Sequence, residues 1–507
     1  MPEFRFRSSP QSSAISGALL PAPDMSTPRA KNLALLLLAL TQFIVVIDAS
    51  IVNVALPSIG TALDIGQDNL SWVVNSYTLV FGGFLLLGGR FADFFGRRRM
   101  FMLGMTLFGA ASLAGGLAQS EEWLIIARAA QGLGAAIASP AALSIVTTTF
   151  REGQERNRAL GIWGAVAGAG GAAGVLLGGI LTEWAGWEWV LFVNVPIAAF
   201  VVWQAPHRLL ESREEEEKER TLDIPGAVSI TAGLALLVYT LVDAASIGWT
   251  ATETFIRGAI AIALIVAFVV IELRTRKPLV PFSIFRNRTL RGANIVGILT
   301  GMSLFSMFFL ITLYLQQVLG QDALEAGLSY LPLSAAIILA AGAAGQLVTR
   351  VGFKPVMVTG LLLLSVALFW FTLISVDGSF LVDVLGPSVL AGVGLGLTFV
   401  PVTIAAMSGT IREEAGLASG LINTSQQVGG ALGLAILASI ANSSTNDAFA
   451  TGAGKVSALN TGFQDAFLIA GFFAVAGAIV AGLLISSKDS REHAEAARRG
   501  EADPPAA

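Results

Sequence analysis

The segment GRFADFFGRR, residues 89–98, follows an apolar stretch and combines two glycines and an aspartate with three arginines. A related segment, GQLVTRVGFK, residues 345–354, follows another apolar stretch at an offset of 256 residues. Helices that cross a bilayer need about 20 mainly apolar residues, and basic residues gather in their cytoplasmic loops. The repeated pattern therefore predicts a membrane protein built from two similar halves.

The composition predicts the same class of protein. Of the 507 residues, 54% are hydrophobic and 13% are charged, whereas about 25% are charged in an ordinary soluble domain. The chain has no cysteine, which excludes disulfides and thiolate metal sites. Its two histidines, His207 and His493, both lie in polar segments. We therefore expect no metal, no cofactor, no catalytic centre and no nucleic-acid partner.

Fourteen runs of mainly apolar residues approach the length of about 20 residues that a bilayer requires. They cover residues 33–57, 72–92, 100–119, 123–147, 158–182, 187–205, 226–243, 256–273, 290–317, 325–347, 355–375, 381–408, 416–440 and 463–485. The connections are mostly short, and we expect the charged stretch 213–220 to be a solvated linker. Residues 1–30 are expected to form a disordered tail, with Met25 as an alternative start.

The placement of lysine and arginine predicts the orientation of the spans. With the N-terminus in the cytoplasm, 28 of the 31 basic residues fall in cytoplasmic segments, as the positive-inside rule requires. An even number of spans then places both termini in the cytoplasm. The expected domains are a tail at 1–30, a six-helix bundle at 31–205, linkers with two inserted helices at 206–289, a second six-helix bundle at 290–486, and a cytoplasmic tail at 487–507.

Glycines repeat between the two bundles at nearly constant offsets. The offset is 259 residues for Gly161, Gly170, Gly171 and Gly174 against Gly420, Gly429, Gly430 and Gly433, and 260 for Gly132 and Gly134 against Gly392 and Gly394. Parallel repeats of six spans are the architecture of many alternating-access transporters. We therefore expect an all-α membrane protein in which two pseudo-symmetric bundles surround a central cavity and move a solute across the bilayer.

The segment 89–98 resembles the signature between the second and third spans of the major facilitator superfamily. The matching residues are Gly89, Asp93, Gly96, Arg97 and Arg98. Phe91 and Phe94 stand where a leucine and a basic residue are usual. Glycines allow close helix approach, and an aspartate can pair with a neighbouring helix end. The resemblance implies a gating role for these five residues. The alternative is a tight turn that only places arginines in the cytoplasm.

The likeness covers nearly the whole chain and extends to the fourteen-helix drug:proton antiporters of this superfamily. In the fourth span, Arg128 to Gly134 is similar to a second motif, and in the first span Asp48 to Pro57 is similar to the fourteen-helix family's own signature. The fifth span matches the antiporter motif at Gly161, Gly170, Gly174, Gly178 and Gly179. Val175 replaces the proline of that motif, and Glu188 replaces a usual arginine. A static packing seam is the alternative interpretation of these glycines.

Asp48 and Arg128 are the candidates for proton coupling. Asp48 lies about 13 Å from the outer end of its span, and Arg128 lies about 8 Å from the same side. A cation within hydrocarbon normally faces a wet cavity or a carboxylate, so we expect the pair to meet in the central cavity. A proton and a cationic or amphipathic solute would compete for Asp48, so that the proton gradient drives export. The alternatives are a structural role for Asp48 and an arginine that reaches the membrane surface.

Polar and aromatic side chains on the spans are candidates for lining the cavity. They are Asn53, Asn75, Tyr77, Gln131, Phe305, Phe308, Tyr314, Gln316, Asn423 and Gln426. Taken singly, each is more often a helix-packing residue. A large apolar pocket with few polar groups favours lipophilic solutes over sugars, which need many hydrogen bonds. The expected partners are a lipophilic or cationic small molecule, protons and the lipid of a bacterial plasma membrane, with a monomer sufficient for function.

Three other functions stay open. They are an uncoupled or importing facilitator of a small metabolite, a membrane enzyme, and a transport-inactive sensor. The enzyme is disfavoured because cysteine is absent and both histidines lie in polar segments. The sensor is disfavoured because it would not need Asp48, Arg128 and Asp93 together. Transport in energised vesicles, with and without a pH gradient, separates an antiporter from a facilitator.

Overall fold

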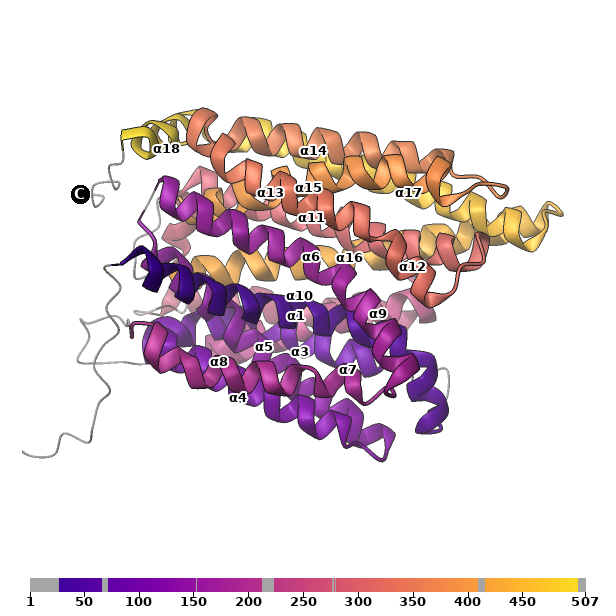
Figure 1. Ribbon diagram of the computed structural model, residues 1–507, viewed down its shortest axis with the longest axis horizontal. Helices are drawn as coiled ribbons and strands as arrows, with labels where there is room; N and C mark the ends of the chain where they lie inside the picture. Colours follow the sequence, from indigo (N-terminus) through magenta and orange to yellow (C-terminus); the bar gives the residue numbers. More distant parts are fainter. Residues whose placement is uncertain are drawn as a thin grey trace, which may run out of the picture.

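The structure is a computed structural model that describes residues 27–65, 72–151, 153–211, 223–275, 278, 280–408 and 415–499. Every regular element among these residues is helical, and the long helices run side by side along one axis (Figure 1). Eleven of the described helical segments are long and apolar enough to cross a membrane. The described part of the chain is therefore an all-helical membrane fold.

The first helix set, as we name it, contains the helices before the charged linker. They are α1 (Pro28–Ala62), α3 (Trp72–Phe95), α4 (Arg97–Gly116), α5 (Glu121–Thr149), α6 (Gln154–Trp184), α7 (Trp189–Phe192) and α8 (Asn194–Arg208). Helix α5 packs against α3 and α4, α1 packs against α6, and α4 packs against α8. The hydroxyls of Thr27 and Ser120 accept hydrogen bonds from the first backbone N–H groups of α1 and α5, as N-cap residues do.

The second helix set follows an inserted pair, α9 (Ile224–Ile247) and α10 (Thr252–Arg274). It consists of α11 (Arg288–Leu313), α12 (Ala323–Ser329), α13 (Leu331–Val351), α14 (Phe353–Trp370), α15 (Leu385–Met407), α16 (Ala415–Ala450) and α17 (Lys455–Leu484), and α18 (Ser487–Arg499) follows it. Short helical turns are η1 (Phe282–Arg286), η2 (Tyr314–Val318), η3 (Phe371–Leu373) and η4 (Phe380–Val384). The inserted helices pack on each other, and α9 also contacts α3 and α16.

The helices differ from the fourteen predicted runs in specific places. Helix α4 begins with three arginines, Arg97 to Arg99, which precede the predicted run 100–119. Helix α1 begins inside the predicted tail, at Pro28, while residues 1–26 and 212–222 lie outside the described residues. Helix α18 occupies part of the predicted C-terminal tail. A search for apolar runs misses it because its sequence, SKDSREHAEAARR, is polar.

The repeated glycines make equivalent contacts in the two helix sets. Gly96 and Gly352 each form the single residue between consecutive helices, with φ of 101° and 88°, a backbone region that glycine enters without a steric penalty. A Cβ added to Gly134 would lie 2.5 Å from a backbone nitrogen of α4, and one added to Gly394 would lie 2.6 Å from a backbone nitrogen of α14. The matched glycines therefore serve matched helix crossings.

Two further crossings join the helix sets to each other. At one, α6 meets α13, and a Cβ added to Gly161 would lie 3.9 Å from Gly345 Cα. At the other, α16 meets α3, and a Cβ added to Gly420 would lie 3.6 Å from Gly89 Cα. The four glycines form two pairs, each of which lets two helix backbones approach closely.

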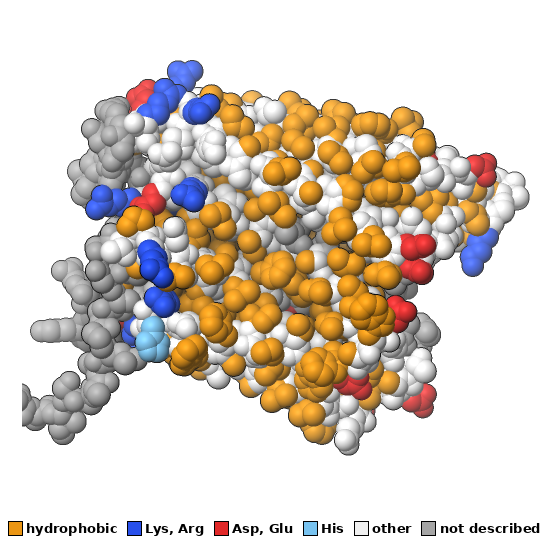
Figure 2. Space-filling model, viewed as in Figure 1, with side chains coloured by type: hydrophobic (Ala, Val, Ile, Leu, Met, Phe, Trp, Pro, Cys, Tyr) orange, Lys and Arg blue, Asp and Glu red, His pale blue; other side chains and the backbone are white. Residues whose placement is uncertain are grey.

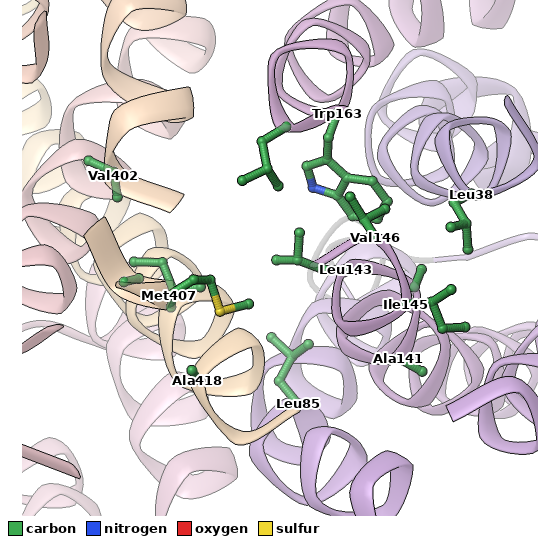
Figure 3. Packing of buried hydrophobic residues seen from close by; sticks show 14 of the residues in the cluster. Leu38, Leu85, Ala141, Leu143, Ile145, Val146, Trp163, Val402, Met407 and Ala418 are labelled. Atoms are coloured by element: carbon green, nitrogen blue, oxygen red, sulfur yellow. The ribbon is translucent and has the colours of Figure 1, made fainter. Parts of the chain in front are cut away.

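Among the described residues, the two helix sets share a buried apolar cluster at one end of the molecule. We call this the terminal end, because α1 begins there and α18 lies there (Figure 1). One buried cluster at this end combines Leu85 and Leu143 of the first set with Val402, Met407 and Ala418 of the second. Figure 3 shows side chains from both sets meeting at this point. At the opposite end, each set has a separate buried cluster of its own, although α12 packs on α6 there.

The molecular surface has an apolar band between two charged ends. Figure 2 shows lysine and arginine side chains gathered mainly at the terminal end, while most of the acidic side chains on this face lie at the opposite end. Large apolar side chains cover the middle of the same face (Figure 2). A band of this kind fits the hydrocarbon core of a bilayer.

Candidate functional site

Asp48 on α1 and Arg128 on α5 form an ion pair inside the first helix set. The Nη1 of Arg128 donates to Oδ2 of Asp48 at 2.6 Å. The side chain of Asp48 is 0% exposed, and that of Arg128 is 1% exposed. The structure thus brings together the two residues whose similar depths predict a contact.

The carboxylate of Asp48 accepts two further hydrogen bonds. Gln131 Nε2 donates to Oδ1 of Asp48 at 2.7 Å, and Asn194 Nδ2 donates to the same oxygen at 2.8 Å. Both amides also donate to the hydroxyl of Ser112, at 3.0 and 3.1 Å, and this hydroxyl donates to the carbonyl of Leu191 at 2.8 Å. An ionised carboxylate only accepts hydrogen bonds, so three donors around Asp48 suit its charged form.

The guanidinium of Arg128 has other partners besides Asp48. Its Nε donates to the carbonyl of Val73 at 3.1 Å, and its Nη1 also donates to Oε1 of Gln131 at 2.7 Å. The guanidinium lies 4.4 Å from the centre of the Tyr77 ring, a favourable position for a cation over an aromatic face. Arg128 is therefore held by α3 and by its own helix as well as by α1.

The ion pair is enclosed by the first helix set. Its partners come from α1, α3, α4, α5 and α8, and Asp48 has no exposed surface. In this conformation the pair is packed among side chains of the first helix set, and its place in a cavity shared by both bundles stays a prediction. Sequence depth fixes the position of a residue along its helix but not the face on which it lies. Removing one partner of such a buried pair typically costs about 3–5 kcal/mol.

Some of the expected cavity residues belong to packed interiors instead. Tyr77 and Gln131 are part of the network around Asp48. Tyr314 is buried in the second helix set, where its hydroxyl donates to the carbonyl of Ser375 at 2.8 Å. These three side chains do not line a common space.

The remaining expected cavity residues are dispersed. Phe308 stacks on Tyr330 with ring centres 5.3 Å apart, and Phe305 is partly exposed beside Gly430. The amides of Asn53 and Asn423 donate to carbonyls of their own helices, at 3.1 and 2.9 Å. Asn75 and Gln426 are half-buried, and Gln316 is exposed. The structure therefore does not gather the ten residues into one site.

The junction of α3 and α4 is hydrogen-bonded to the second helix set through Asp93, near the end of α3. Oδ1 of Asp93 accepts a hydrogen bond from Nη2 of Arg97 at 3.0 Å, and Oδ2 accepts one from the backbone N–H of Leu417 at 3.0 Å. Leu417 lies near the start of α16, where free backbone N–H groups and the helix dipole favour a negative charge. Arg98 instead stays within the first helix set, where it donates to the carbonyl of Leu209 at 3.1 Å.

The glycines of α6 face two different neighbours. Gly170, Gly174 and Gly178 lie against α1; a Cβ added to Gly174 would lie 2.9 Å from the carbonyl oxygen of Ile47, the residue before Asp48. Gly179 faces α12 instead, as does Val175, whose Cγ1 would lie 3.4 Å from a Cβ added to Gly327. Helix α6 is continuous from Gln154 to Trp184, which agrees with the absence of the motif proline.

Sequence reasoning missed two members of the network, Ser112 and Asn194. Each is a single polar residue within an apolar stretch of the first helix set, and both are 0% exposed in the structure. A buried amide or hydroxyl needs a hydrogen-bond partner, so lone polar residues at the depth of Asp48 were the signal that could have identified them.

This bundle of long apolar helices around a buried ion pair defines an integral membrane transporter. The model of the Major Facilitator Superfamily matches residues 38–434, and the chain belongs to this family. The expected membership is confirmed, and the family consists of transporters, not enzymes. Among the described residues, no group of three or more histidine or acidic side chains could hold a metal ion.

Within the family, the chain is similar to proteins of antibiotic export and resistance. It is 40% identical to the cephamycin export protein CmcT of Amycolatopsis lactamdurans, over 89% of this chain and 92% of that protein. It is 36% identical to the puromycin resistance protein pur8 of Streptomyces alboniger, over 90% and 91%. It is 35% identical to the lincomycin resistance protein of Streptomyces lincolnensis, over 83% and 86%.

Solved structures with the same fold are more distant in sequence. The human organic anion transporter MFSD10 aligns with a TM-score of 0.64 at 15% identity, over 90% of this chain and 100% of that one. The proton:xylose symporter XylE aligns with a TM-score of 0.62 at 15% identity, over 92% and 99%. These likenesses show the fold of a multi-pass membrane transporter.

Proposed function

We propose that this chain is a secondary active transporter that exports drug-like amphipathic compounds, lipophilic or cationic, in exchange for protons by alternating access. The observation that carries the proposal is the fully buried ion pair of Asp48 and Arg128 in a bundle of apolar helices. Ionisable residues inside membrane-spanning helices are costly and typically belong to ion or substrate pathways.

The proposed architecture has fourteen spans, in the order six, two and six. Eleven spans qualify by length and composition, and we add helices α4, α6 and α9 because each packs alongside them, which gives fourteen. Residues 31–205 and 290–486 then form two bundles, and 206–289 carry the inserted pair. The basic residues at the terminal end support a cytoplasmic position for both termini. Because two repeats already enclose one pathway, a monomer suffices.

The packing of the two helix sets supports alternating access. Side chains of both sets form one buried cluster at the terminal end, whereas each set has its own cluster at the opposite end. A rocking motion that opens the terminal end would leave the two separate clusters intact. It would break the shared cluster, the two glycine crossings and the hydrogen bonds that join the two sets at this end, such as that from Leu417 to Asp93. In the proposed orientation, this conformation is closed toward the cytoplasm.

The partners of Arg128 support a change of charge at Asp48. When Asp48 takes a proton, Arg128 loses its counter-charge but keeps the carbonyl of Val73, Oε1 of Gln131 and the face of Tyr77. The guanidinium is then still hydrogen-bonded, so protonation does not leave a bare cation in the bundle. A proton moving inward down about 100 mV supplies about 2.3 kcal/mol from the potential alone.

The names of the relatives support antibiotics as the substrate class. The names of three proteins that are 35% to 40% identical to this chain contain the antibiotics cephamycin, puromycin and lincomycin. The alternative is an uncoupled or importing facilitator of a small metabolite. Its substrate movement would not depend on a carboxyl group that gains and loses a proton.

Export and coupling are tested in two steps. An efflux-deficient bacterial host expressing the chain is screened for resistance to puromycin, lincomycin and cephamycin, together with a panel of lipophilic cations. Compounds whose tolerance rises are then offered to acid-inside proteoliposomes of the purified chain. We expect accumulation that depends on the pH gradient and disappears with a protonophore. If tolerance rises for none of these compounds, or if uptake is indifferent to the gradient, the proposal is wrong.

The coupling role of Asp48 is tested with a matched pair of variants. Asp48→Asn keeps the shape of the side chain but cannot exchange a proton. Asp243→Asn serves as the control, because Asp243 also pairs with an arginine, Arg257, but lies on the inserted helix α9. We expect gradient-driven uptake to be lost in the first variant and kept in the second. Undiminished gradient-driven uptake by Asp48→Asn, against the concentration gradient of the compound, would contradict the coupling role of Asp48.

A further inference from the structure

The surroundings of Asp48 are suited to a carboxylate and not to a carboxylic acid. Arg128, Gln131 and Asn194 all present N–H groups to its two oxygens. A protonated carboxyl carries an O–H that needs an acceptor, and in a buried site an unmade hydrogen bond is costly. A residue that exchanges protons at this position therefore needs a neighbour that can change from donor to acceptor.

Arginine cannot make this change, and Gln131 is held in its orientation. Arg128 has no acceptor atom in its side chain. Oε1 of Gln131 accepts a hydrogen bond from Nη1 of Arg128 at 2.7 Å, so turning this amide would aim its N–H group at a cation. The orientation of Gln131 is therefore fixed by Arg128, whatever the charge of Asp48.

Asn194 is not held in this way. Its Nδ2 donates to Asp48 and to Ser112, while its Oδ1 is buried without a hydrogen-bond partner among the described residues. Turning the amide about its last side-chain bond would exchange the two atoms. The turn would break the hydrogen bonds from Nδ2 to Asp48 and Ser112 and none made by Oδ1, and Oδ1 would then face the Asp48 carboxyl group.

We propose that Asn194 is the positioning residue that responds to the charge of Asp48, donating to the carboxylate and accepting from the carboxylic acid after its amide turns. The inference rests on the proposed proton coupling at Asp48. The proton comes from solvent and stays on Asp48; the turn of the amide breaks and forms only hydrogen bonds. Among the described residues, the charged or titratable side chains around Asp48 are Arg128 of α5, which pairs with it, and Tyr77 of α3, whose ring lies against that guanidinium; α4 and α8 contribute Ser112 and Asn194.

The proposal predicts a specific change in the pH dependence of transport. Asn194→Leu removes both the donor and the acceptor at nearly constant volume. A hydrogen bond to a charged group is roughly twice as strong as one between neutral groups, so the variant loses more in the ionised state than in the protonated one. We expect the midpoint of the pH dependence of proteoliposome uptake to move to higher pH by about one unit, a tenfold change in proton concentration.

A matched control is available in the second helix set. Asn460 on α17 is also buried, donates through Nδ2 to a backbone carbonyl at 3.2 Å, and has an Oδ1 without a partner among the described residues. Asn460→Leu removes a comparable amide far from Asp48 in the chain. We expect it to leave the midpoint unchanged. Equal shifts in both leucine variants would overturn the proposal, since the effect would then come from any buried amide.

Infrared difference spectra give a second readout on the purified protein. Acid-minus-base spectra should contain a carboxylic C=O band that Asp48→Asn removes. In Asn194→Leu this band should move to higher wavenumber, because the O–H of the acid has lost its acceptor. An unchanged band together with an unchanged pH midpoint would refute the role of Asn194.

A nearly isosteric variant covers the case in which leucine prevents folding. Asn194→Asp keeps the shape, but the new carboxyl can donate to Asp48 only while it holds a proton, so the midpoint should again move to higher pH. A wild-type midpoint in this variant contradicts the proposal. If Asp48→Asn abolishes coupling while the Asn194 variants behave as wild type, only this inference fails. If Asp48→Asn transports normally, the proposed function fails as well.

Discussion

The carboxylate of Asp93 accepts a hydrogen bond from the backbone N–H of Leu417 at 3.0 Å, across 324 positions of the chain. One oxygen of Asp93 pairs with Arg97 in the first helix set, and the other binds the start of α16 in the second. Asp93, for which the family resemblance implies a gating role, thus has a definite partner in the second helix set in this conformation. Asp93 ties the two helix sets together at the terminal end.

Replacing Asp93 should loosen this end. Asp93→Asn removes the charge that favours the start of α16, which we expect to weaken the closed terminal end by about 1–2 kcal/mol, or roughly tenfold in population. The chain has no cysteine, so Met407→Cys in the shared cluster gives a unique label. Maleimide labelling at this position should become faster in Asp93→Asn.

The control for this prediction is Glu211→Gln. Glu211 pairs with Arg98 and Arg99, which belong to the same helix set, so its loss should leave the labelling rate at Met407→Cys unchanged. Equal rates in all three backgrounds would show that Asp93 does not hold the terminal end closed.

At the crossing of α6 and α13, a larger side chain should be harmful at Gly345 and tolerated at Gly342. A Cβ at Gly345 would lie 2.7 Å from the carbonyl oxygen of Asn157, while a Cβ at Gly342 would meet nothing within 4 Å. We expect Gly345→Val to abolish most transport and Gly342→Val to keep it. Both rates are measured as uptake at equal amounts of reconstituted protein. Similar uptake by the two variants would argue against close approach at this crossing.

Removing Arg128 alone should destabilise the protein. Arg128→Met leaves Asp48 buried without its cation, at a typical cost of about 3–5 kcal/mol. The double variant Asp48→Asn with Arg128→Met should recover part of this loss, because no uncompensated charge remains. Thermal unfolding in detergent measures both effects. A double variant less stable than Arg128→Met would mean that the pair does not act as a unit.

Helix α18 should help to keep the terminal end closed. Nε2 of His493 on α18 lies 3.1 Å from Oδ1 of Asn157 on α6. Oγ of Ser490, also on α18, accepts a hydrogen bond from the backbone N–H of Lys354 on α14 at 3.0 Å. The helix therefore contacts both helix sets. Deleting residues 487–507 should speed the labelling of Met407→Cys several-fold, whereas deleting only 500–507 should not. Identical rates after both deletions would contradict this role.

Much of the fold follows from the sequence because membrane crossing imposes a strong, local pattern. Apolar runs and the clustering of basic residues identify the helices, and the offset between Gly89 and Gly345 identifies the related loops. The search for apolar runs fails at α18, whose polar sequence becomes a helix by packing Ala494 and Ala497 against the bundle. A search for long apolar runs does not detect a short helix that is apolar on one face only.

The candidate site was only partly predictable. The contact between Asp48 and Arg128 was predictable because the rise of 1.5 Å per residue gives the two residues similar depths in the membrane. Rotation about the helix axis is set by packing, which the sequence does not state. The pair was therefore expected in a shared cavity, and the cavity list combined network residues such as Gln131 with distant ones such as Tyr314.

Among the described residues, the partners in the ion-pair network all come from the first helix set, although both sets have matched glycine crossings. Under the proposed function, the residues that couple transport to protons lie in the first helix set, and the residues that select the substrate can vary independently of them. A chimera that joins residues 1–289 of this chain to the corresponding C-terminal portion of pur8 should keep this chain's response to pH. The spectrum of compounds that it expels should then move toward that of the relative.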